Sequence, residues 1–537
     1  MEKRHYFILA FLLAFLTIPS YYLYLLIPKG SKLEAADVPA REISSQRYFT
    51  HVNHLASDGM RGRGNGSTEL EIAADYVAAQ FRIRGLQPGG ENGSYFQTLD
   101  VITNAEIGND NELLLGTDAL QFKEDFQLMR FSTALEVTAP LVFVGYGITA
   151  PEMHWDDYRE IDVTDKIVVA FRHEPQEMDA SSPFDGTEMT SHASFMNKTI
   201  NAKRHGAKAI IFIMDPNNHT PDEEALRSTT ARSEKDNSGI AAAYVRSEPV
   251  LSYFKQAGYS LGDIQREIDT ELESKSFELE GSEAHLVSNV TRVHSTIRNV
   301  IGAIPGTNPK WKNEWIILGA HYDHLGLGNE YSMERSAAGR IHNGADDNAS
   351  GTAGILELAR VISENRARLD RSVLFIAFAG EELGLFGSNH FVNYPTIDLE
   401  HVVAMLNFDM IGRLNNNRAF IGGVGTSPNF TNLLTSFNEA IDLTLDYSES
   451  GSGSSDHTSF NIKKIPVLFF FSGLHGDYHR PSDTAEKINA EGARNVLMLA
   501  YNMIDHLAGD IERPLYSEVF EERPLRSSGG GYGPYFG

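Results

Sequence analysis

Three polar clusters, each following a hydrophobic run, constrain the fold of this chain more than any other feature. Residues 315–382 read as strand, loop, helix and strand, with the segments WIILGAH, HNGADDNASGTAGILELARVI and SVLFIAFAG. In an open α/β sheet, sites form outside the carboxyl ends of the strands, so we expect the clusters to converge. The clusters are His321 with Asp323, Asp346 with Asp347, and Glu381 with Glu382.

An alternation of strand-like and helix-like segments continues to residue 507 and predicts the fold class. Near-continuous runs of Val, Ile, Leu and Phe, such as VVAMLNF and IPVLFFF, are typical of strands that are buried on both faces. Helical spacing recurs between these runs, as at residues 349–364 and 491–507. We therefore predict an α/β domain with a mostly parallel sheet and helices on both faces.

A β-rich module interrupts this domain between residues 139 and 280. Its short runs, such as APLVFVGYGI and AKAIIFIMDP, alternate with polar loops. None of its segments concentrates catalytic residue types. The predicted organisation has five parts: an N-terminal targeting segment (1–30), the first part of the main domain (31–138), the insert (139–280), the catalytic part (281–510) and a flexible Gly-rich tail (511–537).

The N-terminal segment predicts export. Lys3 and Arg4 precede an apolar stretch at residues 6–27, which is near the ~20 residues that span a bilayer as a helix. An uncleaved membrane anchor and a cleaved signal peptide both fit this pattern. Because the positive end stays inside, either interpretation places the remainder in the periplasm or outside the cell.

Composition excludes several classes of function. The 537 residues contain 46 Lys and Arg against 72 Asp and Glu, a formal net charge of −26, with no long basic run. Nucleic acid is therefore not an expected partner. The chain has no cysteine, which removes thiolate metal ligands, disulfides and a cysteine nucleophile. A metal site in this chain has to use His and carboxylate ligands.

The chemistry of each polar residue has a plain structural alternative. Asp323 suits a carboxylate that accepts the second N–H of a metal-bound His321. Asp347 precedes a helix, so it could bridge two metals or simply cap that helix. Adjacent acids at a buried strand end are costly without a cation, and they point in different directions. One of Glu381 and Glu382 can therefore bind metal while the other acts as a general base.

Two further candidates follow later strands. Asp409 ends the run VVAMLNF, and His479 lies in GDYHRPSD after IPVLFFF. Alone, each could be structural. Because five positions at successive strand ends all carry metal-ligand residue types, coincidence is a poor explanation, and a hydrolytic zinc centre is the better one.

These segments together resemble a known family. In order along the chain, AHYDH, GADDNASG, FAGEELGLFGS, NFDMIG, SSDHTSF and YHRPSDT are similar to the motifs of the M28 family of zinc aminopeptidases. The resemblance covers about residues 48–135 and 290–507. The insert at 139–280 resembles a protease-associated (PA) domain through its GYGI, WDDY and KIVV segments.

The resemblance implies a centre with two Zn²⁺ ions. His321 and Asp409 would hold one ion, Glu382 and His479 would hold the other, and Asp347 would bridge them. The bridging residue of the family matches the Asp directly before Asn348, which is Asp347 and not Asp346.

Catalytic roles are implied in the same way. Glu381 would be the general base, Asp323 would orient His321, and Tyr478 would donate a hydrogen bond to the tetrahedral intermediate. The expected substrate is a peptide or protein with a free N-terminus. Other readings within the fold are a glutaminyl-cyclase-like enzyme with one zinc, a carboxypeptidase or dipeptidase, and a receptor-like relative without catalysis.

Overall fold

The computed structural model describes residues 42–184, 186, 189–219, 237–329, 331–509 and 511–519. The apolar segment predicted at residues 6–27 and the Gly-rich sequence after residue 519 lie outside this part of the chain. Among the residues that are described, no helix is both long and apolar enough to cross a membrane.

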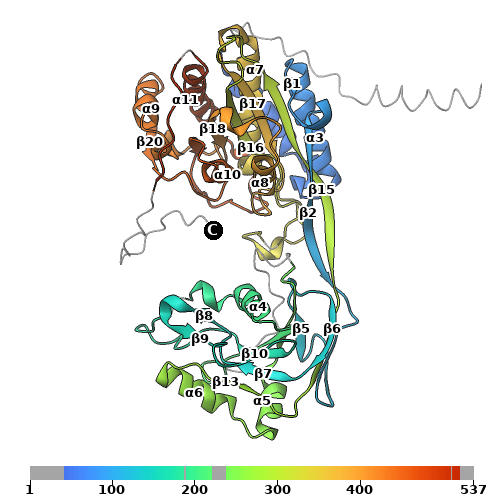
Figure 1. Ribbon diagram of the computed structural model, residues 1–537. Coiled ribbons are helices and arrows are strands. Elements are labelled where there is room, and N and C mark those ends of the chain that lie inside the picture. The colour runs from blue at the N-terminus through green and yellow to red at the C-terminus, as the bar shows by residue number, and fades with distance from the viewer. Residues whose placement is uncertain are drawn as a thin grey trace, which may run out of the picture. The chain divides into compact units, whose positions relative to one another are not determined.

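A nine-stranded mixed sheet forms the centre of the α/β domain (Figure 1). Its four middle strands are parallel, in the spatial order β17, β16, β18, β21. Antiparallel pairs then join β15 to β17 on one side and β19 to β21 on the other. The predicted α/β class with a mostly parallel sheet is confirmed. The bounds are β15 Val290–Ile304, β16 Trp315–His321, β17 Ser372–Phe378, β18 Val402–Phe408, β19 Arg418–Gly422, β20 Thr444–Tyr447 and β21 Val467–Phe471.

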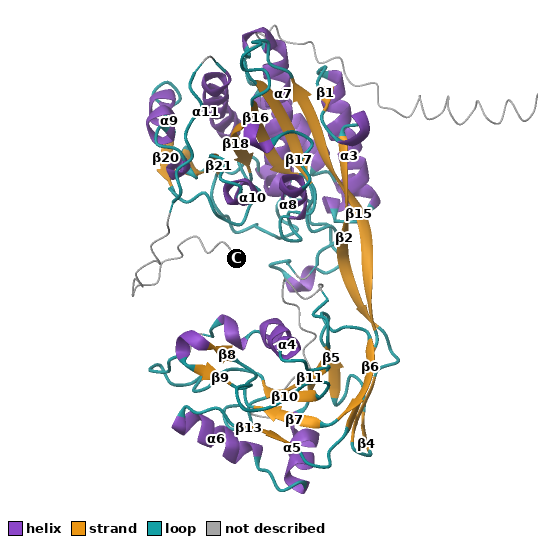
Figure 2. Ribbon diagram, viewed as in Figure 1, coloured by secondary structure: helices purple, strands orange, loops and turns teal. Residues whose placement is uncertain are grey.

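Helices cover both faces of this sheet (Figure 2). Ile316 and Leu318 of β16 face one hydrophobic core, and Ile317 between them faces a second core. This alternation explains why the strand sequence is apolar at every position. The first core includes α2 (Ser45–Leu55), α3 (Thr68–Ile83), α7 (Gly351–Glu364), α9 (Phe430–Asn438) and α11 (Ala490–Ala508). The second core includes α8 (Phe386–Asn393) and α10 (His457–Ile462).

The turn before α7 is the least regular part of the domain. A helix was expected from about residue 349, but α7 begins at Gly351 and is preceded by a wide turn over Ala345–Ser350. Asp347 in this turn has extended backbone angles, φ −105° and ψ 97°. Gly344 has φ 58°, and a Cβ there would lie 2.2 Å from the Asp347 carbonyl oxygen. Only glycine allows this close approach, which holds Asp347 at the sheet edge.

The inserted module has its own six-stranded sheet. Strands β7 (Leu141–Val144), β10 (Ile167–Phe171), β11 (Ala209–Ile213) and β12 (Ala241–Val245) are parallel neighbours. The edge strands β13 and β5 are antiparallel. A four-stranded sheet has the order β4, β3, β14, β6. The remaining bounds are β3 Glu112–Leu115, β4 Asp118–Leu120, β5 Phe126–Leu128, β6 Leu135–Ala139, β13 Ser276–Glu278, β14 Ala284–Ser288, α4 Phe195–Arg204, α5 Ser247–Gln256 and α6 Leu261–Glu271.

A long antiparallel strand pair connects the insert to the central sheet. The chain leaves along β2 (Phe96–Ile107) and returns along β15, and the two strands pair from Val300↔Phe96 to Val290↔Ile107. Between these two strands, the strands of the insert begin with β3 at residue 112 and end with β14 at residue 288. The predicted domain boundaries at 139 and 280 stay predictions.

Candidate metal centre

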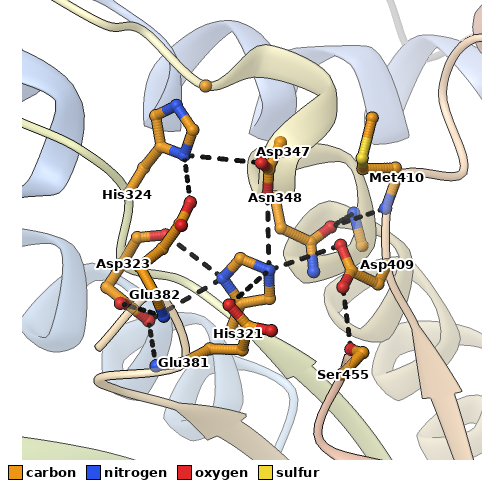
Figure 3. Close-up of polar contacts among 12 residues, drawn as sticks. His321, Asp323, His324, Asp347, Asn348, Glu381, Glu382, Asp409, Met410 and Ser455 are labelled. Carbon is orange, nitrogen blue, oxygen red and sulfur yellow. Dashed lines mark hydrogen bonds and ion pairs between the residues drawn. The ribbon is translucent and has the colours of Figure 1, made fainter. Parts of the chain in front are cut away.

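The predicted site residues that follow β16, β17 and β18 lie together with Asp347 (Figure 3), and His479 contacts Asp347 and Glu382. His321 is the last residue of β16, and Asp409 follows the last residue of β18. Glu381 and Glu382 come three and four residues after β17. Because all three strands are parallel, their ends meet at one edge. We call this group the central cluster: His321, Asp347, Glu381, Glu382, Asp409 and His479.

One half of the central cluster surrounds His321. Its Nε2 lies 3.4 Å from Asp347 Oδ1, 3.3 Å from Asp409 Oδ1 and 3.9 Å from Glu381 Oε2. The second oxygen of Asp409 accepts a hydrogen bond from Ser455 Oγ at 2.7 Å. Asp409 is therefore fixed from behind while its Oδ1 faces the imidazole.

The other half surrounds His479. Its Nε2 lies 3.2 Å from Asp347 Oδ2 and 3.2 Å from Glu382 Oε2. Asp347 thus directs one carboxylate oxygen toward each imidazole. Asp346 does not take part, because its Oδ1 accepts the Gly412 backbone N–H at 2.6 Å. Of the two adjacent acids, Asp347 alone lies between the two halves.

The hydrogen-bond partners of the two rings direct each Nε2 toward carboxylates. Nδ1 of His321 lies 3.2 Å from the Asp323 carbonyl oxygen, and Nδ1 of His479 lies 3.0 Å from the Tyr331 carbonyl oxygen. A carbonyl oxygen only accepts, so Nδ1 carries the hydrogen and each Nε2 is left facing carboxylates. Each Nε2 between carboxylate oxygens needs a positive charge at that position, which either its own proton or a metal ion can supply.

The spacing also suits a metal ion. Ligand atoms bound tetrahedrally at about 2.0–2.1 Å from one zinc lie roughly 3.3 Å from one another. The separations from Nε2 of His321 and of His479 to Asp347, Asp409 and Glu382 are 3.2–3.4 Å. The ligand chemistry and the distances therefore fit a divalent metal in each half.

Negative charge dominates the electrostatics. Burial, together with Asp409 and Glu382, raises the pKa of Glu381 well above its usual range. Burial alone would lower the pKa of His479, but Glu382 and Asp347 raise it to about 11. Both raised pKa values mean that the central cluster favours an added positive charge, whether a proton or a metal ion.

Asp323 holds the two glutamates in place. Its Oδ1 accepts the Glu381 backbone N–H at 3.2 Å, and its Oδ2 accepts the Glu382 backbone N–H at 3.2 Å. Asn65 Nδ2 donates to the same Oδ2 at 2.7 Å. Toward His321, the Asp323 carboxylate is 3.7 Å away, farther than its own carbonyl oxygen. The side chain thus contacts the Glu381–Glu382 turn more closely than it contacts His321.

Tyr478 lies against the imidazole of His479. Its ring stacks on His479 with centroids 3.8 Å apart and an interplanar angle of 22°. It packs next to a small apolar group made of Met410, Phe469 and Phe471.

Sequence reasoning missed His324. Its Nδ1 lies 2.7 Å from Glu382 Oε1 and 3.8 Å from Asp347 Oδ2, and the residue is buried. The AHYDH segment contained this second imidazole three residues after His321, which was the available signal. His324 contacts the oxygen of Glu382 that faces away from His479, so it orients that carboxylate.

Two supporting residues were also missed. Arg63, in the segment SDGMRGRGNGS, is fully buried and donates to the carbonyls of Tyr322, Asn343 and Gly344 at 2.8–2.9 Å. Asp483 accepts the backbone N–H of Asp347 at 3.1 Å, and burial raises its pKa to about 6. Both brace backbone that carries the central cluster. Asp483 lies in the YHRPSDT segment, which was the available signal for it, whereas no quoted motif contains Arg63.

Two parts of the chain match known protein families. Residues 299–504 match peptidase family M28, and residues 137–251 match the PA domain. The chain belongs to peptidase family M28 and carries a PA domain. The resemblance expected from the motifs is confirmed.

Individual relatives support the M28 assignment. The chain is 30% identical to leupeptin-inactivating enzyme 1 of Streptomyces exfoliatus over 35% of this chain and 38% of that protein. It is 29% identical to aminopeptidase YwaD of Bacillus subtilis over 56% of each. These alignments span about half or less of the relatives' own lengths. The solved aminopeptidase from Aneurinibacillus sp. strain AM-1 shares the fold, with a TM-score of 0.55, 24% identity, and coverage of 90% of this M28 chain and 98% of that one.

Proposed function

We propose that this chain is an aminopeptidase that hydrolyses the N-terminal peptide bond of peptides or proteins with two Zn²⁺ ions. One observation carries the proposal: Asp347 directs its two carboxylate oxygens at two imidazoles, 3.4 Å from His321 Nε2 and 3.2 Å from His479 Nε2. A shared carboxylate of this kind suits a two-metal site. Membership of family M28 supports the same conclusion.

The ligand assignment follows from the two halves of the central cluster. His321 and Asp409 would hold one zinc, His479 and Glu382 the other, with Asp347 shared. When bound, the pair of metals supplies positive charge that lowers the pKa of a shared water and stabilises the developing oxyanion.

Glu381 is the proposed general base. Its Oε2 lies 3.9 Å from His321 Nε2, whereas Asp347 and Glu382 each approach an imidazole more closely, at 3.4 and 3.2 Å. Its backbone is held by Asp323, so the carboxylate can turn toward the substrate without moving the turn. Glu381 would take the proton of the attacking water and deliver it to the leaving amine. A base with a raised pKa suits this transfer near neutral pH.

A panel of substrates tests this proposal. Aminoacyl and peptide substrates with free and with blocked N-termini are compared on the purified protein, with chelator and with zinc added back. We expect free amino acids to be released from the unblocked substrates alone, and chelator to abolish this release until zinc is restored. Preference for blocked peptides, release from the C-terminus, cyclisation of N-terminal glutamine or activity that resists chelator would each overturn it.

Export is a separate proposal that rests on the sequence of residues 3–27, with basic residues before an apolar stretch. Fractionation of cells that express the full chain tests it. Protein recovered in the cytoplasmic fraction would contradict export.

A further inference from the structure

A second cluster of histidines and carboxylates lies in the PA domain. His173 comes two residues after β10, and Asp215 comes two residues after β11. Glu177 and His219 each follow four residues later. Because β10 and β11 are parallel and their last residues are paired, the two loops begin side by side. The carboxyl ends of parallel strands are where sites form in α/β sheets.

Four ligand atoms converge between these two loops. Nδ1 of His173 lies 3.1 Å from Glu177 Oε2 and also contacts Asp215 Oδ2. Nε2 of His219 lies 2.9 Å from Glu177 Oε1. The two rings are close, with centroids 4.5 Å apart, and one ligand atom from each residue lies within 4.8 Å of the other three.

The carboxylates of this cluster are buried. Glu177 and Asp215 are 2% and 0% exposed, while the two imidazoles close the cluster from its more exposed side. Buried Lys198 is attracted to Asp215, but its hydrogen bonds go to the backbone carbonyls of Phe171 and His173. Two buried acids therefore face two imidazoles, and burying such charge is costly without a bound cation.

Hydrogen bonding accounts for this arrangement only in part: Asn218 Nδ2 donates to Glu177 Oε1 at 2.8 Å, and the His173 backbone N–H donates to Asp215 Oδ2 at 3.3 Å. One ring nitrogen carries either a single hydrogen or a lone pair, yet Nδ1 of His173 faces oxygens of both Glu177 and Asp215. Glu177 in turn directs its two oxygens at different imidazoles. A metal ion placed among the four side chains satisfies all of them at once.

We propose that His173, Glu177, Asp215 and His219 bind one Zn²⁺ ion as a structural site in the PA domain. Nitrogen and carboxylate oxygen donors without thiolates suit zinc, and four protein ligands complete a tetrahedral shell. Such a closed shell leaves no position for substrate, so the ion stabilises the fold and takes no part in hydrolysis. It ties the loop after β10 to the loop after β11. This site is distinct from the central cluster and does not depend on the proposed peptidase activity.

Metal counting on the full-length protein tests the proposal. Zinc per chain is measured by mass spectrometry after gel filtration for wild type, His219→Ala, Asp215→Asn and the control His192→Ala. His192 is a histidine of the same domain that pairs with the exposed Glu152 at 2.8 Å, away from the cluster. We expect His219→Ala and Asp215→Asn to hold one zinc fewer than wild type, and His192→Ala to match wild type. Equal zinc in all four proteins overturns the site.

Anomalous diffraction from wild-type crystals gives a test that needs no variant. Data collected on either side of the zinc absorption edge should show a peak among the four side chains. No peak there, or a peak that appears only at the edge of another metal, overturns the assignment.

Discussion

The Asp323 carboxylate accepts the backbone N–H of Glu381 at 3.2 Å, and through this bond the end of β16 fixes the turn after β17. The same carboxylate also accepts the N–H of Glu382 at 3.2 Å. Two adjacent glutamates with different proposed roles therefore share one support. Because neither the base nor the ligand can shift without breaking a buried hydrogen bond, the support sets the direction of both.

Asp323→Asn tests this support. The side-chain amide of the variant has one oxygen and one NH₂ group, and its NH₂ group faces one of the two backbone N–H groups and cannot accept from it. One buried hydrogen bond is therefore lost, which lowers the free energy of unfolding by about 1–3 kcal/mol. We expect kcat to fall about 10–100-fold, with weaker zinc retention, as for other groups that orient metal ligands. Asn65→Ala, which removes only the donor to Oδ2, should have a smaller effect on kcat. An Asp323→Asn variant that is less stable but has wild-type kcat would show that Asp323 is merely structural.

Glu381→Gln separates proton transfer from metal binding. The amide cannot accept the proton of water, so we expect kcat to fall about 10²–10⁴-fold, the usual contribution of a general base. Zinc content should equal that of wild type, because Glu381 is not assigned as a ligand. Steady-state kinetics and metal analysis on the same preparation check both points. Activity within a few-fold of wild type would remove Glu381 from the mechanism.

His479→Ala should remove a ligand of the proposed second zinc. Its Nε2 faces both Asp347 and Glu382, and its loss leaves that half of the central cluster without an imidazole from this loop. We expect one zinc fewer per chain than in wild type and a large loss of activity. His475→Ala is the matched control, because the His475 ring faces Asp346, outside the central cluster. Unchanged zinc content in His479→Ala would contradict the assignment.

His51 predicts an acid sensitivity of folding unrelated to the metals. Burial, then Arg84 and other positive neighbours, lowers its pKa to about 4, and its Nδ1 lies 2.6 Å from the Tyr76 hydroxyl. The unfolded pKa is about 6.5, so between pH 6.5 and 4 the unfolded state binds more protons. The contribution of neutral His51 is intact above pH 6.5 and is lost as pH falls toward 4, by up to about 3 kcal/mol.

His51→Gln isolates this effect, since Gln does not titrate. Unfolding is followed by circular dichroism at pH 7 and pH 4.5, and the stability of wild type relative to the variant should decrease on acidification. His401→Gln is the control, because His401 is half-exposed and pairs with Asp398 at the surface. A wild-type advantage that is the same at both pH values would show that His51 does not titrate in this range.

The sequence by itself determined the class of the fold and the residue types of the central cluster. Unbroken apolar runs such as β18 are typical of strands buried on both faces, and His321 and Asp409 at the ends of such runs fall at one sheet edge in any parallel arrangement. These inferences hold because the side-chain pattern of a strand and the residue type at its end are local properties of the chain.

Only the tertiary structure decided which side chains meet. The local pattern alone did not decide which of Asp346 and Asp347 bridges the two metal positions. In the structure, the wide turn and the Gly344 conformation direct Asp347 inward, while Asp346 accepts the Gly412 backbone N–H. In the PA domain no single segment was rich in catalytic residue types, yet pairing of β10 with β11 brings His173 next to Asp215. The reason is physical: contacts between residues far apart in sequence depend on strand order and register, which the packing of the whole domain sets.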